Sequence, residues 1–284
     1  MTFWTLQIVN GIAFGMLLFI LASGLSLIFG LMNVVNLAHG SLYLVAAYVG
    51  VFVSAYTGNF VLAVLAGVVS SGILGVLMHV SLLRHYTEKV MAQVMITLGC
   101  LFILSDVSLW ICGGDPMVVR KPMMFESIVR IGEIGFPSYR LLVILIGGVV
   151  GLFLWWFQEG TKYGAIVRAG VDDQEMAEAV GMNIPLVMTL VFGLGGLLAG
   201  LAGVIGGSFI GVYPGVDFEI LLLAIVVVII GGLGSLRGAL IGALLVGIVD
   251  GIGRALFPNL SMFLLFFLVV VVLAIKPSGL FGKE

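Results

Sequence analysis

The sequence predicts an all-α protein, a polytopic transmembrane helical bundle. Hydrophobic residues make up 62% of the 284-residue chain and charged residues only 9%, whereas soluble domains hold about 45–50% apolar and about 25% charged residues. The mean hydropathy is +1.30. The apolar runs approach the roughly 20 residues of a membrane-spanning helix and exceed the roughly 10-residue alternating segments of a β-barrel. We therefore expect a single membrane domain over residues 1–284.

Nine apolar runs follow one another along the chain and are the candidate spans. Several are short or interrupted by glycine, so we expect eight to ten spans, some of them broken or re-entrant. The run LVFGLGGLLAGLAGVIGG carries small residues at helical spacing, which in membranes lets helix backbones pack closely. The nine runs cover residues 6–31, 42–57, 60–83, 94–111, 141–157, 186–207, 220–234, 239–253 and 262–275.

The basic residues give a weak indication of orientation. If residues 83–93, 159–185, 235–238 and the C-terminal tail lie inside, seven basic residues share that side and five lie opposite, in slight agreement with the positive-inside rule. With nine full spans the N-terminus then lies outside, and residues 113–140 form an external loop. The inner group is Arg84, Lys89, Lys162, Arg168, Arg237, Lys276 and Lys283, and the outer group is Arg120, Lys121, Arg130, Arg140 and Arg254.

A compact charged segment, EGTKYGAIVRAGVDDQEMAEAVGMNIP, occupies residues 159–185 between two apolar runs. Its stretch DQEMAEAV favours a short helix, which Asp172 or Asp173 can cap and Gly181 can end. Glu175 and Glu178 are three residues apart and share one face of that helix. A short acidic helix between two spans suggests a docking site for a partner. The alternative is a solvated loop.

Four polar residues interrupt what would otherwise be one long apolar run near the N-terminus. In FGLMNVVNLAHGSLYLVAAY, residues 29–48, they are Asn33, Asn36, His39 and Ser41. Polar groups at membrane depth are costly unless they face a cavity or a partner, and on a helix the first three would share one side. We interpret this stretch as a discontinuous helix whose break lines the substrate pathway. The alternative is a turn at the membrane surface.

A second stretch, IIGGLGSLRGALIGALLVG at residues 229–247, has a similar form. An apolar run ends in a break containing Gly232, Gly234 and Ser235, and a helix rich in small residues follows. His39-Gly40-Ser41-Leu42 corresponds in order to Arg237-Gly238-Ala239-Leu240. Paired, glycine-interrupted segments in two halves of a transporter indicate an internal repeat with a site between the halves. We therefore add these three break residues to the predicted pathway.

Few ionisable or reactive residues remain inside the predicted spans. Asp106 is a candidate pathway charge, while Asp250 has Arg254 four residues later, a spacing that favours a local ion pair. Cys100 and Cys112 lie twelve residues apart on one predicted helix, about 18 Å by helix rise, so they cannot form a disulfide with each other.

The sequence also excludes several classes of function. It contains no phosphate-binding G-x-x-x-x-G-K-[ST] loop, no spacing typical of metal ligands, no nucleophile–base pair and no nucleic-acid-binding pattern. We therefore expect no catalytic residue, no metal and no cofactor bound by this chain.

Four stretches together resemble the permease subunits of bacterial ATP-binding-cassette (ABC) importers for branched-chain amino acids, the LivH type in particular. The likeness runs nearly end to end. The stretches are NGIAFGMLLFILASGLSLIFGLMNVVNLAHGSLYLVAAY, RAGVDDQEMAEAVGMN, GLLAGLAGVIGG and IIGGLGSLRGALIGALLVG.

The resemblance implies a set of partners for a multi-pass subunit in the bacterial inner membrane. These are two ABC ATPase subunits that bind ATP and Mg²⁺, a sister permease or a second copy of this chain, and a soluble periplasmic substrate-binding protein. It also implies that the helix within residues 173–181 docks into the ATPase, although Glu178-Ala179-Val180-Gly181 lacks the spacer that the family's fuller pattern has before the glycine. The candidate coupling residues are Asp172, Asp173, Glu175, Glu178, Ala179 and Gly181.

A different class of function remains open at this point. A self-contained secondary carrier or channel driven by an ion gradient would use Asp106, Asp250 and His39 as an ion relay. The small number of buried ionisable residues and the charged helix between two spans favour the importer. Leucine, isoleucine and valine are the default substrates that the resemblance implies, and related systems carry amides, urea or aromatic acids.

Overall fold

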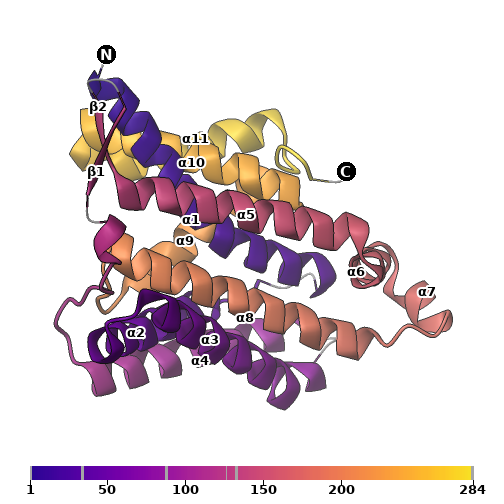
Figure 1. Ribbon diagram of the computed structural model, residues 1–284. Helices are drawn as coiled ribbons and strands as arrows, with labels where there is room; N and C mark the ends of the chain where they lie inside the picture. Colours follow the sequence, from indigo (N-terminus) through magenta and orange to yellow (C-terminus); the bar gives the residue numbers. More distant parts are fainter. Residues whose placement is uncertain (1, 33–34, 87–88, 126, 132–133, 283–284) are drawn as a thin grey trace.

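The computed structural model describes the chain except for residues 1, 33–34, 87–88, 126, 132–133 and 283–284, and that part is mostly helical (Figure 1). The first half contains α1 (Thr2–Met32), α2 (His39–Thr57), α3 (Phe60–Ser81), η1 (Leu83–His85) and α4 (Val90–Cys112). The middle contains η2 (Met123–Phe125), β1 (Ile128–Ile131), β2 (Ile134–Pro137), α5 (Ser138–Gly160), α6 (Lys162–Asp172) and α7 (Gln174–Ala179). The last part contains α8 (Ile184–Phe209), α9 (Val216–Gly231), α10 (Leu236–Leu256), η3 (Pro258–Leu260) and α11 (Ser261–Ile275).

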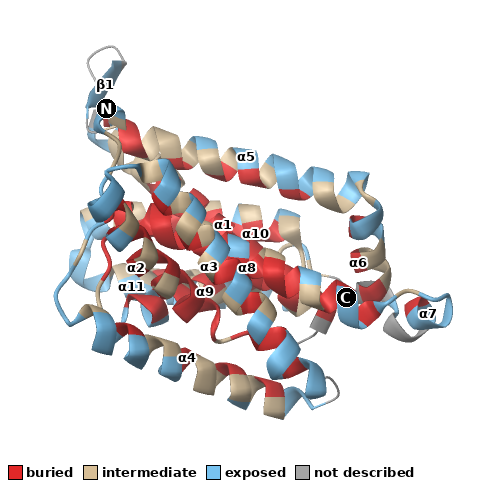
Figure 2. Cartoon of the chain, turned by 60° about the horizontal axis from the view of Figure 1, so that its bottom comes forward, coloured by how far each residue is buried: buried red, intermediate tan, exposed pale blue. Residues whose placement is uncertain are grey.

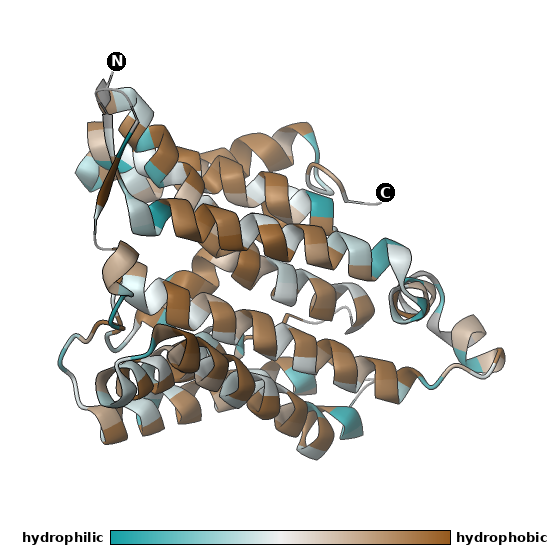
Figure 3. Cartoon of the chain, in the orientation of Figure 1, coloured by the Kyte–Doolittle hydropathy of each residue, from teal (hydrophilic) through white to brown (hydrophobic). Residues whose placement is uncertain are grey.

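Eight of the described helical segments are long and apolar enough to cross a membrane, and hydrophobic residues run along their lengths (Figure 3). This confirms the predicted all-α polytopic bundle and its eight to ten spans. Helix α11 reaches spanning length together with η3, as Pro258–Ile275, whereas α9 is not among the eight segments. It has 16 residues, a rise of about 24 Å, whereas the hydrocarbon core of a bilayer is about 30 Å thick.

The two ends of the bundle carry different features (Figure 1). The N-terminus and the β1–β2 hairpin lie at one end, whereas α6, α7 and the C-terminus lie at the other. The two termini therefore lie at opposite ends, which requires an odd number of crossings. The eight long segments and the shorter α9 together make nine. Helices α1 and α8 form much of the core, and α4, α5 and α11 lie at the periphery with large apolar side chains exposed (Figure 2).

Two groups of three helices, α1–α3 and α8–α10, pack in the same way. Helix α1 packs along α10 as α8 packs along α3, and α9 packs on α1 as α2 packs on α8. Helix α1 starts at the hairpin end and α8 at the opposite end, next to α7 (Figure 1). The two groups therefore form inverted repeats, an arrangement found in many transporters.

The internal repeat thus pairs its segments differently from the sequence prediction. The prediction matched the start of α2 with the start of α10, whereas the packing matches α1 and α2 with α8 and α9. The starts of α2 and α10 have similar sequences for another reason. Each begins a helix at a position where a glycine packs closely against a neighbouring helix. Gly40 packs against Leu221 and the backbone of Asp217, and Gly238 packs against the backbone of Gly231.

Close glycine contacts hold the equivalent helix pairs together. A Cβ atom added at Gly11 of α1 would lie 2.7 Å from the carbonyl oxygen of Gly247 in α10. A Cβ added at Gly200 of α8 would lie 2.8 Å from the carbonyl oxygen of Gly67 in α3. These approaches confirm that the predicted small-residue stripe of α8 serves helix packing.

The segment over residues 113–140 is more ordered than the predicted loop. It contains the antiparallel hairpin, in which Ile128 pairs with Pro137 and Ile131 with Ile134, and α5 already starts at Ser138. Before the hairpin, the N–H of Val119 donates to the carbonyl of Gly207 at 3.2 Å, and Ser208 Oγ donates to the carbonyl of Val119 at 3.1 Å. The prediction misses these features because the strands are short and the anchor of Val119 lies far away in the sequence.

Candidate functional site

The predicted docking helix exists as α7. Asp173 is its N-cap, and its Oδ1 atom accepts a hydrogen bond from the N–H of Met176 at 2.9 Å. Gly181 has a φ of +88°, a conformation that favours glycine at a helix end. The N–H of Met182 then donates to the carbonyl of Ala177 at 3.1 Å and closes the helix. The structure therefore selects Asp173 rather than Asp172 as the cap.

Helix α7 presents most of its described side chains to the outside. Ala177 is buried and anchors the helix, whereas Asp173, Met176, Glu178, Ala179, Val180 and Gly181 are exposed. Asp172 is the last residue of α6, and Glu175 lies in the first turn of α7. The side chains of Asp172 and Glu175 lie outside the described part of the structure. The role of these six residues in docking stays a prediction.

Helix α6, which the sequence analysis does not predict, joins α7 to the bundle. The Thr161 hydroxyl accepts from the N–H of Gly164 at 3.0 Å and caps its start. At its other end, a Cβ added at Gly170 would lie 3.0 Å from Leu31 Cδ1 and 3.3 Å from Ile184 Cδ1. Helix α6 therefore contacts the last turn of α1 and the first turn of α8 at once.

The predicted break after α1 is present, but its polar residues are buried. Asn36 Oδ1 accepts from the N–H of Ala38 at 3.1 Å, and Ser41 Oγ donates to the carbonyl of Ala38 at 2.9 Å. His39 begins α2, and its Nε2 lies 3.0 Å from the carbonyl oxygen of Leu21. Each of these three residues is at most 1% exposed, and Asn33 lies outside the described residues. These residues precede or begin a helix rather than share one helical face.

The predicted break after α9 is also present, and two of its glycines have positive φ angles, +100° at Gly232 and +76° at Gly234. Ser235 Oγ accepts from the N–H of Gly238 at 3.1 Å and caps α10. The C-terminal tail, residues 276–282, packs on this break. The N–H groups of Leu280 and Phe281 donate to the carbonyls of Ile230 and Gly231, each at 2.9 Å. The tail thus supplies partners for the last carbonyls of α9.

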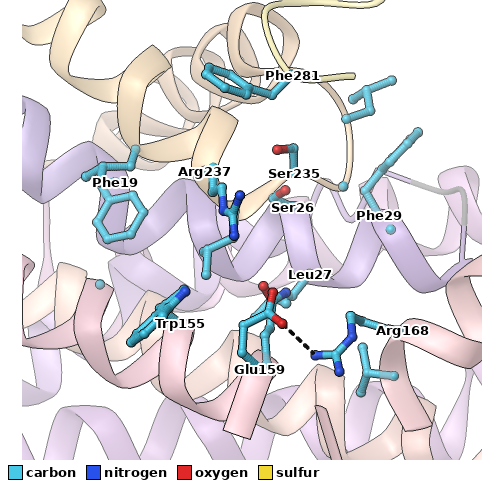
Figure 4. A pocket seen from close by; sticks show the side chains of 18 of the residues that line it. Phe19, Ser26, Leu27, Phe29, Trp155, Glu159, Arg168, Ser235, Arg237 and Phe281 are labelled. Atoms are coloured by element: carbon cyan, nitrogen blue, oxygen red, sulfur yellow. Dashed lines mark ion pairs between the residues drawn. The ribbon is translucent and has the colours of Figure 1, made fainter. Parts of the chain in front are cut away.

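A cavity of about 950 Å³ lies beside this break (Figure 4). Its walls come from α1, α5, α6, the start of α10 and the tail, and we call it the α5–α10 cavity. Of the predicted pathway residues it holds Gly234 and Ser235, but not Gly232, Asn36, His39 or Ser41. A smaller cavity of about 170 Å³ lies between the two breaks, with Val35 of the first break and Leu233 of the second in its lining. The polar lining of the α5–α10 cavity includes Ser26, Glu159, Arg168, Ser235 and Arg237.

The acidic residues of the spans divide into three kinds. The predicted ion pair is confirmed, because Arg254 Nε lies 2.7 Å from Asp250 Oδ2. Asp106 lies exposed on α4 and is not among the residues that line the α5–α10 cavity. Asp217, which the sequence analysis overlooks, is fully buried in the first turn of α9 and accepts a hydrogen bond from Ser105. An acid at the start of an apolar run is the signal that could have revealed it.

The described residues contain no disulfide and no cluster of metal-binding side chains. Cys100 and Cys112 are free thiols on α4, as predicted. Among the residues that the structure describes, no group of three or more His, Cys, Asp and Glu side chains could hold a metal ion. No hydrogen bond or ion pair in the same part of the chain joins Asp106, Asp250 and His39 into a relay.

The sequence is similar to known transport proteins over nearly its whole length. The family described as "Branched-chain amino acid transport system / permease component" matches residues 7–275. The chain is 26% identical to the high-affinity branched-chain amino acid transport system permease protein LivH of Escherichia coli (strain K12), covering 98% of this chain and 95% of that protein. It is 24% identical to BraD of Pseudomonas aeruginosa with the same coverage. The ribose import permease protein RbsC of Haemophilus influenzae is 28% identical over 66% of this chain and 57% of its own length.

Proposed function

This chain belongs to the family of branched-chain amino acid transport system permease components, and on that premise we propose that it carries branched-chain amino acids across the bacterial inner membrane. As a member of the family it is the multi-pass permease subunit of an ABC importer. The substrate proposal rests on LivH and BraD, which are named for branched-chain amino acids. This chain aligns with 95% of the length of each of them. The ribose permease matches a smaller part of both chains.

An importer of this class works with ATPase and binding-protein partners. We propose that two ATPase subunits, which would hold ATP and Mg²⁺, bind on the side of α6 and α7. A soluble periplasmic binding protein would bind at the hairpin end. A sister permease, or a second copy of this chain, would complete the membrane part. The chain itself has no phosphate-binding loop, so ATP hydrolysis belongs to the partner.

The observation that carries the coupling proposal is the position of α7. It is a capped six-residue helix beyond the ends of the spans (Figure 1), and its exposed surface combines Glu178 with the apolar Met176 and Val180, which are 61% and 66% exposed. Exposed apolar groups beside a charge are typical of a protein interface. A groove of the ATPase would bind this surface.

The mechanism follows from the connections of α7. When ATP binding closes the ATPase pair, the groove pushes α7, and α6 transmits the displacement to the ends of α1 and α8 that it contacts. These two helices are packed through backbone contacts at Gly11, Gly200 and their partners, so they move as rigid bodies rather than deform. The motion thereby reaches both repeats and opens the pathway between them.

The test is co-purification of the ATPase with a tagged chain from native membranes. Glu178→Lys and Met176→Glu alter the proposed docking surface, and we expect each to release the ATPase. Asp115→Lys, a charge reversal at an exposed position of the segment before the hairpin, is the matched control and should retain it. If the ATPase stays bound to both α7 variants, the contact lies elsewhere.

A second experiment tests substrate and energy source. Proteoliposomes with the complete importer should take up radiolabelled leucine when ATP is enclosed, and excess valine but not ribose should compete. Collapse of the proton gradient should leave uptake intact. Uptake that needs the gradient and ignores ATP would instead support a secondary carrier with Asp106 and Asp250 as the residues to test.

A further inference from the structure

The α5–α10 cavity has a polar end at the level of α6. Arg168 of α6 and Arg237 of α10 supply two positive charges there, and Glu159 of α5 supplies one negative charge (Figure 4). The Nη1 atom of Arg168 lies 3.9 Å from Glu159 Oε2 and makes no hydrogen bond to a described residue. The polar end therefore carries net positive charge with unused donors.

A buried hydroxyl in the cavity wall also lacks a partner. Ser26 of α1 is 1% exposed, lines the cavity, and its Oγ atom has no hydrogen-bond partner among the described residues. Buried polar groups in proteins nearly always have partners. Together with the arginines, Ser26 indicates that the cavity accommodates a group with hydrogen-bond acceptors.

The other end of the cavity is apolar and extends far along α5. Met16 and Phe19 of α1 and Gly147, Gly148 and Leu152 of α5 line it. From Gly147 to Glu159 the helix rises by about 18 Å. A Cβ added at Gly148 would meet no atom within 4 Å, so the space beside it is open. This length exceeds what a single amino acid needs and suits a flexible hydrocarbon chain.

The cavity also opens toward the bilayer. Leu152 and Trp155 line it and are 68% and 55% exposed, and both lie on α5, a spanning helix at the periphery of the bundle. A tryptophan near the end of a span is typical of the membrane interface. The ligand can therefore enter sideways from the lipid.

We propose that the α5–α10 cavity binds an anionic phospholipid, with its phosphate between Arg168 and Arg237 and an acyl chain along Gly148. Basic pockets between spans on the cytoplasmic side bind anionic headgroups. The choice of leaflet rests on the proposed function, which places α6 in the cytoplasm. A bound headgroup would connect α6 to the first turn of α10 and so brace the element that carries α7.

The test is native mass spectrometry of the purified full-length chain in detergent, titrated with dioleoyl phosphatidylglycerol or dioleoyl phosphatidylcholine. We expect the anionic lipid to bind preferentially, and Arg237→Ala to weaken it about fivefold. Gly148→Leu should abolish the preference for a long-chain over a short-chain phosphatidylglycerol. The controls are Arg84→Ala, at an exposed arginine elsewhere, and Gly99→Leu, at a helical glycine with equally open surroundings. Both controls should bind like the wild type.

Four results would overturn the proposal, three of them from lipid and phosphate binding and one from competition with leucine. The first three are equal binding of both lipids, unchanged long-chain binding by Gly148→Leu, and binding of inorganic phosphate with the affinity of the lipid, which would identify a soluble phosphate as the ligand. Displacement of the lipid by leucine would assign the cavity to the imported substrate instead. The experiment needs no ATPase, so its outcome is independent of the docking test for α7.

Discussion

Ser105 and Asp106 are neighbours on α4 whose side chains meet different surroundings. Ser105 donates to the fully buried carboxylate of Asp217, whereas Asp106 is exposed. Successive residues of a helix point about 100° apart, so one position can be internal while the next faces outward. A charged residue within an apolar run is conspicuous in a sequence, so Asp106 is predicted as a candidate, whereas a serine in such a run attracts no attention. The hydroxyl of Ser105, beside Asp106, is one of the contacts that join α4 to α9.

Loss of the Ser105 hydroxyl should destabilise the protein. Ser105→Ala removes the one described donor to Asp217 and leaves a buried carboxylate without it, and we expect the free energy of unfolding to fall by about 1.5–3 kcal/mol. Ser70→Ala is the matched control, because Ser70 Oγ donates only to the carbonyl of Gly67 in its own helix, and it should change stability by about 0.5 kcal/mol or less. Thermal unfolding in detergent measures both, and equal losses would contradict the role of Ser105.

At the scale of elements, α9 illustrates how a short helix can end inside the bundle. Buried carbonyls at a helix end need partners, and the tail provides N–H groups for those of Ile230 and Gly231. Gly279 of the tail approaches the backbone of Gly232 closely, and its φ is +79°. The tail and the break therefore form one unit, which also closes one wall of the α5–α10 cavity.

Removal of the tail should loosen the break after α9. A chain truncated after Lys276 leaves the carbonyls of Ile230 and Gly231 without their partners, at a cost of about 1–3 kcal/mol for each buried group. In a background without the native cysteines, we expect Ser235→Cys to react with a maleimide at least about fivefold faster in this chain than in the full-length one. A chain that lacks only residues 283–284 is the control and should react at the full-length rate. Unchanged reactivity of the longer truncation would show that the break holds without the tail.

At the scale of the whole molecule, local sequence signals predict the helices, whereas long-range contacts determine how the helices, the tail and the segment before the hairpin pack together. The cap at Asp173 and the stop at Gly181 act within one turn, so the sequence predicts α7 nearly to the residue. Other contacts join positions far apart in the chain. They are the hydrogen bonds from Leu280 to Ile230 and from Val119 to Gly207, and the packing between the inverted repeats. No periodicity or motif records such contacts. Both predicted helix breaks are present and the second one lines the α5–α10 cavity, while their role as a substrate pathway stays a prediction.

The inverted repeats give α6 a central place in the proposed transmission of motion from α7. Helices α1 and α8 occupy equivalent positions in the two repeats, and the end of one and the start of the other meet α6 at Gly170. A push on α7 therefore reaches both repeats at the same point. A side chain there would approach Leu31 and Ile184 closely, so a large one has to displace them.

A larger side chain at Gly170 should separate docking from transport. In Gly170→Leu the new side chain would displace Leu31 and Ile184 and move α6 away from α1 and α8, while α7 keeps its own cap and exposed surface. We expect the ATPase to co-purify as with the wild type and ATP-driven leucine uptake to fall by about tenfold or more, within the usual range of coupling energies. Gly99→Leu, in open surroundings on α4, should retain uptake. If Gly170→Leu transports normally, the motion reaches the repeats by another route. If the variant loses both the ATPase and uptake, α6 shapes the docking surface itself.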